Sequence, residues 1–192
     1  MPDRYRMIKK LAESYLRTRK NAIHTEISTQ FAYRLLEGEA GDEDIVIPAI
    51  LVHDVGWSQV PEELQLKAFG PKATLPEWNR VHEVEGARIA RQILNEAGYE
   101  LRKIEEILVI IEGHDSRKEG ISLNDKLVKD ADKLWRYSRK GVEINSRRYE
   151  YTFEQYLERL RTNLEGWFLT DSARQIAKTE MAGRILEGKA LS

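Results

Sequence analysis

The chain contains four histidines, and each falls on or just past the apolar side of a segment with helical spacing. They are His24, His53, His82 and His114, about 30 residues apart. Apolar residues at steps of three and four predict amphipathic helices, so each imidazole is predicted to face the interior. One such histidine alone is usually a hydrogen-bonded core residue. Four of them on four helices favour a metal site, because neutral imidazole is a common metal ligand.

An aspartate directly follows the second histidine, at the end of the apolar run Ala49–Val52. Neighbouring residues on a helix point about 100° apart. Both His53 and Asp54 therefore reach one site only if it lies near the axis of a helical bundle or holds two metals. Carboxylates beside imidazoles suit Fe, Mn, Co, Zn or Mg rather than copper(I).

The ordered set of a histidine, a His-Asp pair and a distal aspartate resembles the HD-domain superfamily of metal-dependent phosphohydrolases. His24, His53 with Asp54, and the motif at 131–134 match that pattern in order and spacing. His82 and His114 occupy the places where superfamily members with two metals carry further histidines. The resemblance implies one or two divalent ions, with Fe or Mn expected first and Mg, Co, Ni or Zn as alternatives. The implied metal ligands are His24, His53, Asp54, His82, His114 and Asp132.

The distal carboxylate has two candidates, Asp130 and Asp132, which lie about 200° apart on a helix and cannot both face the site. Helical phase does not separate them clearly. The Ala-Asp-x-Leu form of the superfamily favours Asp132, with Asp130 as the alternative.

The expected reaction is attack on phosphorus by a metal-bound hydroxide that Asp54 orients. Lys133 follows the distal aspartate and is expected to face the bound phosphate, and Asp115 is a candidate proton acceptor or partner of a ligand. Each of these has an ordinary alternative as a solvated surface charge. The candidates for substrate binding are four arginines and one tryptophan that can stack on a base: Arg80, Arg136, Arg147, Arg148 and Trp57.

The expected substrate is a small phosphorylated compound, and the preference for a nucleotide follows from the resemblance alone. Two other functions stay open on the same scaffold. One is a di-iron oxygenase, which bound iron and oxygen consumption would reveal. The other is a nucleotide-binding protein without catalysis, which would bind without turnover.

Composition narrows the class of protein. Lys and Arg (31) nearly cancel Asp and Glu (32), which disfavours a nucleic-acid partner or a polybasic membrane surface. The absence of cysteine excludes thiolate ligands and disulfides. With no apolar run typical of a signal peptide or a membrane span, we expect a cytoplasmic protein without a membrane partner, and a homo-oligomer stays open.

Helical spacing almost throughout predicts an all-α fold, a single compact HD-domain bundle with additional C-terminal helices. We expect one domain over residues 1–192, with an HD core at about 21–138 and a C-terminal extension at about 152–188. Pro48 is expected only in the first turn of its helix. The connection 56–75 is typical of a lid or a substrate-facing loop, and 139–151 is expected to be a polar loop. The helices are expected at 3–19, 21–36, 45–55, 62–69, 76–97, 101–113, 123–138, 152–164 and 171–187.

Overall fold

The computed structural model describes residues 1–18, 20–71 and 73–191. Within these ranges the chain forms ten α-helices and two short 3₁₀ helices and has no strand, which confirms the predicted all-α class. In chain order the elements are α1 (Asp3–Ala12), α2 (Asn21–Leu36), α3 (Glu43–Val52), η1 (Val55–Gln59), α4 (Glu62–Ala68), α5 (Glu77–Glu96), α6 (Leu101–Ile111), α7 (Leu123–Leu134), η2 (Trp135–Tyr137), α8 (Arg139–Tyr149), α9 (Phe153–Trp167) and α10 (Asp171–Leu191).

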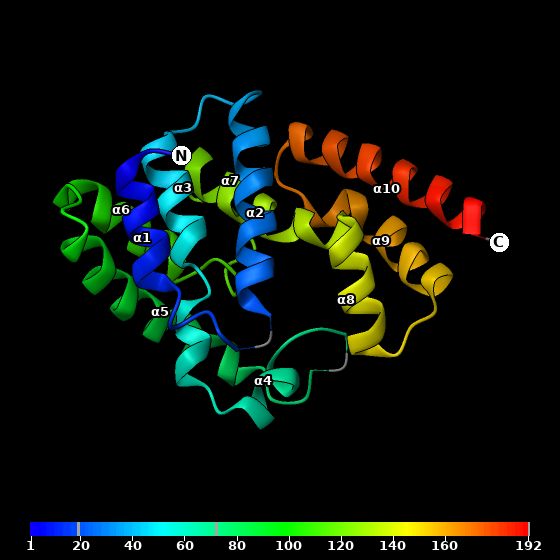
Figure 1. Cartoon of the computed structure of the whole chain (residues 1–192), viewed down its shortest axis with the longest axis horizontal. Helices are drawn as coiled ribbons and strands as arrows, with labels where there is room; N and C mark the ends of the chain where they lie inside the picture. Colours follow the sequence, from blue (N-terminus) through cyan, green and yellow to red (C-terminus); the bar gives the residue numbers. More distant parts are fainter. Residues whose placement is uncertain (19, 72, 192) are drawn as a thin grey trace.

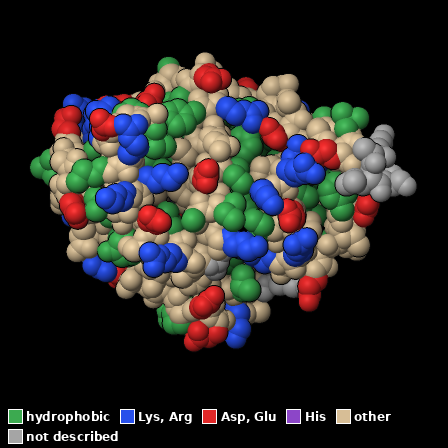
Figure 2. Space-filling model, in the orientation of Figure 1, with side chains coloured by type: hydrophobic (Ala, Val, Ile, Leu, Met, Phe, Trp, Pro, Cys, Tyr) green, Lys and Arg blue, Asp and Glu red, His purple; other side chains and the backbone are tan. Residues whose placement is uncertain are grey.

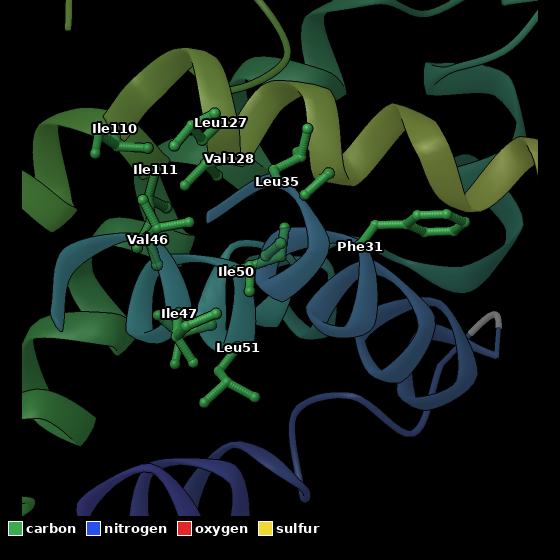
Figure 3. Packing of buried hydrophobic residues seen from close by; sticks show 14 of the residues in the cluster. Phe31, Leu35, Val46, Ile47, Ile50, Leu51, Ile110, Ile111, Leu127 and Val128 are labelled. Carbon is green, nitrogen blue, oxygen red and sulfur yellow. The ribbon is translucent and has the colours of Figure 1, made fainter. Parts of the chain in front are cut away.

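The bundle is organised around α3, which is apolar on every side. All eight residues from Ile45 to Val52 are buried, so this helix needs neighbours all round it. It packs against α1, α2, α6 and α7. Figure 3 shows its side chains between those of the neighbouring helices, with Phe31 and Leu35 on α2. In Figure 1, α1, α3 and α6 lie at one end of the molecule and α8, α9 and α10 at the other, with α2 between them.

Pro48 lies in the interior of α3 and not in its first turn, which corrects the sequence-based expectation. A proline has no N–H, so the carbonyl four residues earlier, that of Asp44, loses its helical partner. The hydroxyl of Tyr99 donates to that carbonyl at 2.8 Å. The helix tolerates the proline because a side chain from the loop between α5 and α6 supplies the missing hydrogen bond.

Several other boundaries differ from the prediction, among them the end of α3 at Val52, the end of α7 at Leu134 and the end of α9 at Trp167. Helix α1 ends at Ala12, and the predicted end at Arg19 lies outside the described residues. The N–H of Ala22 donates to the carbonyl of Leu16. Helix α10 continues to Leu191, past the predicted end at Glu187.

The segment predicted as a polar loop forms helix α8. Its start is capped by Ser138, whose Oγ accepts the N–H of Gly141 at 3.0 Å, and few of its side chains are buried. A helix with so narrow a buried face gives a weak periodic pattern, which explains the error. The capping box predicted from Thr152 and Gln155 is present at the start of α9.

No helix within the described ranges combines the length and the apolar composition that crossing a membrane requires.

Candidate metal centre

The predicted metal ligands come from separate elements and meet at one place. Each has 7% or less of its surface exposed. His24 lies on α2, His82 on α5 and Asp132 near the end of α7, whereas three ligands lie just beyond helix ends: His53 and Asp54 after α3, and His114 after α6.

The end of α3 explains how neighbouring residues reach the same site. The helix stops at Val52, and Asp54, with φ −101° and ψ 4°, has left helical geometry and starts η1. The 3₁₀ helix then packs directly on α5. A Cβ atom on Gly56 would collide with the carbonyl of His82 and with the backbone of Gly86. A glycine is therefore required for the His-Asp pair to lie beside His82.

The first group of ligands surrounds the Nε2 atom of His24. That atom lies 2.9 Å from Nε2 of His53 and 3.1 Å from Oδ1 of Asp132. The Oδ2 atom of Asp54 lies 3.4 Å from it. Two ligand atoms that each lie about 2.1 Å from an ion, at 90° to 110° to each other, are about 3.0 to 3.4 Å apart. These spacings fit a common divalent ion.

The second group surrounds His82 and His114, whose Nε2 atoms lie 3.3 Å apart. The Oδ1 atom of Asp54 is 3.9 Å and 3.8 Å from them, and Oδ2 of Asp115 is 3.7 Å and 4.0 Å from them. Oδ1 also lies 3.7 Å from Nε2 of His53, so the carboxylate of Asp54 lies between the two groups, with Oδ2 on the side of His24. Asp115, predicted only as a proton acceptor or a partner of a ligand, lies where it can bind the second ion.

The hydrogen bonds of the imidazoles show which ring nitrogens carry protons. Nδ1 of His53 lies 2.8 Å from the carbonyl of Ile50, and Nδ1 of His114 lies 2.7 Å from that of Ile111. A carbonyl only accepts, so both Nδ1 atoms must donate, and a neutral ring then has a lone pair on Nε2. Lone pairs that converge beside carboxylates repel one another unless a cation lies among them. The side chains therefore fit divalent ions, and the N/O donor set suits borderline metals.

The pKa shifts of two histidines also indicate that the cluster attracts a cation. Burial lowers the pKa of His24. Burial also opposes protonation of His114, but Asp115 and Asp54 outweigh it and raise the pKa of His114 to about 10. The carboxylates thus attract positive charge into a buried place, where a proton and a metal ion compete for it.

Two further side chains hold the ligands in position. Trp57 donates from Nε1 to Oδ1 of Asp54 at 3.0 Å and stacks on the ring of His82 at 4.0 Å. Trp57 was predicted to stack on a base, but it is 1% exposed and one face of its ring already contacts His82. Sequence reasoning missed Glu83, whose Oε1 accepts the N–H groups of Asp115 at 2.9 Å and Ser116 at 2.8 Å. An acid on the inward side of α5, next to His82, was the available signal.

The two aspartates of α7 occupy different places. Asp132 lies in the first group of ligands. Asp130 accepts hydrogen bonds from the N–H groups of Leu169 and Thr170 and from the Thr170 hydroxyl, which anchors the start of α10. The structure thus places Asp132, and not Asp130, in the cluster.

A cavity of about 310 Å³ opens beside the cluster. His24, Asp54 and Asp132 border it, as does Asp115. Trp57 also contributes to its wall. The remaining lining side chains are mainly cationic, amide and aromatic: Asn21, Phe69, Asn79, Lys133, Trp135, Arg136, Asn145, Arg148, Tyr149, Tyr156, Arg159 and Trp167, with Gly70 and Pro71. The predicted substrate-facing connection 56–75 thus reaches the cavity at its end.

The predicted phosphate-binding cations divide into two sets. Lys133, Arg136 and Arg148 line the cavity. Arg80 does not, because it bonds to the carboxylates of Glu112 at 2.7 Å and Glu83 at 3.2 Å. The side chain of Arg147 is 79% exposed and pairs with Glu143 across 3.5 Å, beside a separate hollow. Arg80 and Arg147 are therefore removed from the candidates for substrate binding.

Sequence reasoning also missed part of the cavity wall. Tyr149, Tyr156, Arg159 and Trp167 lie on α8 and α9. Nothing local in the sequence marks these side chains as functional, because only the packing of α8 and α9 brings them to the cluster.

Comparison with known proteins shows which family this chain resembles. The family model described as "HD domain" matches residues 21–137. A crystal structure at 1.45 Å resolution, described as a predicted HD superfamily hydrolase from an uncultured Thermotogales bacterium, has a similar fold. The TM-score is 0.65 at 19% sequence identity, over 97% of this chain and 90% of the other, and at this identity the similarity shows the fold alone. No curated protein was found to match the chain.

Proposed function

Because the chain belongs to the HD-domain family, we propose that it is a metal-dependent phosphohydrolase that acts on a small phosphorylated compound, with a nucleotide as the leading candidate. The observation that carries the proposal is the position of Asp54. Its two oxygens face two groups of imidazoles, 3.4 Å from His24 and 3.8 Å from His114, beside a cavity lined by cations.

The proposed ligands are His24, His53, Asp54 and Asp132 for one ion, and Asp54, His82 and His114, with Asp115, for the other. Divalent ions held there lower the pKa of a bound water and neutralise charge on phosphoryl oxygens. The chain itself needs no nucleophilic side chain. The proposed reaction therefore does not depend on a cysteine, which the chain lacks.

The other side chains bind and orient the substrate. The guanidinium of Arg136 is held by the carbonyl of Asp132 at 3.0 Å and by its carboxylate at 3.6 Å. Its remaining N–H groups are available to a phosphoryl oxygen, since guanidinium has five donors. Asp115 lines the cavity, and where only one of its oxygens binds the ion the other would accept a proton from the attacking water. Trp57 fixes the orientation of Asp54.

The preference for a nucleotide rests on the size and walls of the cavity. A volume of about 310 Å³ is at the lower end of small-molecule sites. Trp135 offers aromatic surface for a base, although it also contacts the edge of His24 at 4.8 Å.

The first test combines metal analysis with a panel of phosphoesters, including nucleoside mono-, di- and triphosphates, assayed with Mn, Mg, Fe, Co and Ni. Asp54→Asn is compared with Asp3→Asn, which makes the same chemical change at a carboxylate that is 90% exposed. We expect metal-dependent phosphate release that falls about 1000-fold in Asp54→Asn, because both ions lose a shared ligand. Asp3→Asn is expected to match the wild type.

Other outcomes are equally informative. Two tightly bound irons with oxygen consumption and no phosphate release would replace hydrolysis with oxidation. Protein that binds none of these metals would contradict the proposed centre itself.

A further inference from the structure

The cavity beside the metal centre extends well beyond the HD region. The family model ends at residue 137, yet six side chains of the wall lie between residues 145 and 167: Asn145, Arg148, Tyr149, Tyr156, Arg159 and Trp167. These come from α8 and α9. The part of the substrate that lies farthest from the HD region must therefore contact these helices.

The cations of the cavity differ in how they are paired. Arg136 pairs with Asp132 across 3.6 Å and belongs to the metal end. Neither Lys133 nor Arg159 has an ion-pair partner among the residues that the structure describes. On the same helix as Arg159, Arg161 pairs with Glu158. Lys133 and Arg159 thus each bring to the cavity wall a positive charge that has no paired carboxylate among the described residues.

Stacking holds the guanidinium of Arg159 at the wall. It lies 5.6 Å from the centre of the Trp167 ring, and that of Arg136 lies 6.0 Å from the same centre. The ring thus links the arginine at the metal end to the arginine on α9. Two guanidiniums on one ring repel each other, and an anion near them relieves this repulsion.

A buried amide provides an independent sign of a ligand. Asn21 is 2% exposed and lines the cavity one turn before His24. Its Nδ2 atom has no hydrogen-bond partner among the described residues. Buried donors rarely remain without a partner, because losing water without a replacement is costly. An oxygen of a bound anion would satisfy this donor.

At the proposed metal end, two divalent ions, the carboxylates of Asp54, Asp115 and Asp132, the guanidinium of Arg136 and a phosphate dianion would together carry no net charge. A bound hydroxide would add one negative charge, which is fewer than the two positive charges that Lys133 and Arg159 bring. Lys133 and Arg159 remain in excess within the same cavity. Over the face shown in Figure 2, by contrast, Lys and Arg side chains are interspersed with Asp and Glu. The excess of cations calls for a further negative group on the substrate.

We propose that the substrate carries a second anionic group, a phosphate or a carboxylate, which Arg159 and Lys133 bind at the cavity wall beyond the metal centre. This inference rests on the proposed function for the identity of the first group. Specificity then comes from α9 together with α7, and a substrate with one phosphate alone lacks half of its charged contacts.

The test uses ligands that cannot be hydrolysed. Calorimetry on the metal-loaded protein compares α,ω-diphosphonates of increasing chain length with alkylphosphonates of the same length, and with ω-phosphonocarboxylates. We expect at least one diphosphonate or phosphonocarboxylate to bind about 10-fold more tightly than its alkylphosphonate, as a charge-assisted pair requires. The favoured probe identifies the second group as phosphate or carboxylate.

Variants assign the gain to named side chains. Arg159→Gln should abolish the gain in affinity for probes with two anionic groups, and Arg159→Lys should keep part of that gain. Arg161→Gln, the matched control on α9, should keep all of it. Equal affinity for probes with one and two anionic groups at every length in the wild type would overturn the proposal, whether or not a variant folds. A gain that survives both Arg159→Gln and Lys133→Gln would overturn it too. The probes are not hydrolysed, so this binding test does not depend on activity. If probes with two anionic groups bind more tightly but the phosphoester panel shows no phosphatase activity, the proposed function is contradicted and the second subsite is not.

Discussion

Asp130 and Asp132 lie two residues apart on α7, but their carboxylates contact different parts of the molecule. Asp132 has an oxygen 3.1 Å from Nε2 of His24. Burial opposes its ionisation, but Arg136 and the imidazoles outweigh burial and hold the pKa of this carboxyl well below its usual range. Asp130 instead accepts three hydrogen bonds from Leu169 and Thr170. One carboxylate lies in the proposed metal centre and the other holds the start of α10 to the bundle.

The same substitution at these two positions should therefore give opposite results. Asp132→Asn should weaken metal binding at least about 100-fold, since even partners of a ligand contribute 10- to 100-fold. Asp130→Asn should leave metal binding nearly unchanged and reduce the free energy of unfolding by about 1–3 kcal/mol, because an amide replaces a buried acceptor. Metal titration and urea unfolding on both variants measure the two effects. Loss of metal in Asp130→Asn with a stable fold would contradict this assignment.

At this scale the sequence predicted the histidines and the His-Asp pair, because each lies on an inward helical face or directly after an apolar helix. Helical phase could not choose between Asp130 and Asp132, because both are buried and phase alone does not say which neighbour each faces. The preference for Asp132 came only from the Ala-Asp-x-Leu form of the superfamily. Sequence reasoning also missed Glu83, since its partners are the N–H groups of a loop 32 and 33 residues away.

At the scale of elements, the contact between η1 and α5 sets the distance between the two groups of ligands. Gly56 lies against the carbonyl of His82 and the backbone of Gly86, with no room for a methyl group. Backbone atoms cannot move aside as a flexible side chain can. The close approach therefore fixes Asp54 relative to His82.

We expect Gly56→Ala to move η1 away from α5, with a loss of about 1–3 kcal/mol of stability or more and loss of the ion nearest His82. Gly166→Ala is the matched control, because a Cβ there meets no atom within 4 Å. Gly166 lies in the last turn of α9, where this change should be neutral or stabilise by up to about 1 kcal/mol. Thermal unfolding and the number of metal ions per chain report both effects. A fully loaded Gly56→Ala protein would show that the contact is not required.

Elements with wide apolar faces were predicted with nearly correct limits, as for α2 and α9. The error at α8 has a physical cause: its sequence is polar, and what holds it is the cap at Ser138 and contact with α9 and η2. The interior Pro48 was unexpected because its compensation, the hydroxyl of Tyr99, comes from a residue 55 positions from Asp44.

At the scale of the whole molecule, the bundle positions a centre that no single helix could build. The ligands span residues 24 to 132, and the cavity wall continues to residue 167. The sequence predicted the HD fold through the order of its ligands. The shape of the cavity could not be predicted, because it depends on where α8 packs against η2 and α9.

Bound metal should stabilise the folded chain, because the unfolded chain cannot bring ligands from distant segments together. An ion at 100 times its Kd adds about 2.7 kcal/mol, which corresponds to a rise in Tm of about 5–10 °C for a chain of this size. We expect Mn or Fe to give this rise, a chelator to reverse it, and Asp54→Asn to abolish it, while Asp3→Asn keeps it. Differential scanning fluorimetry over a metal titration makes the measurement. A Tm that is independent of all these metals would mean that protons alone neutralise the buried carboxylates, and the cluster would then be a structural feature of the core and not a metal centre.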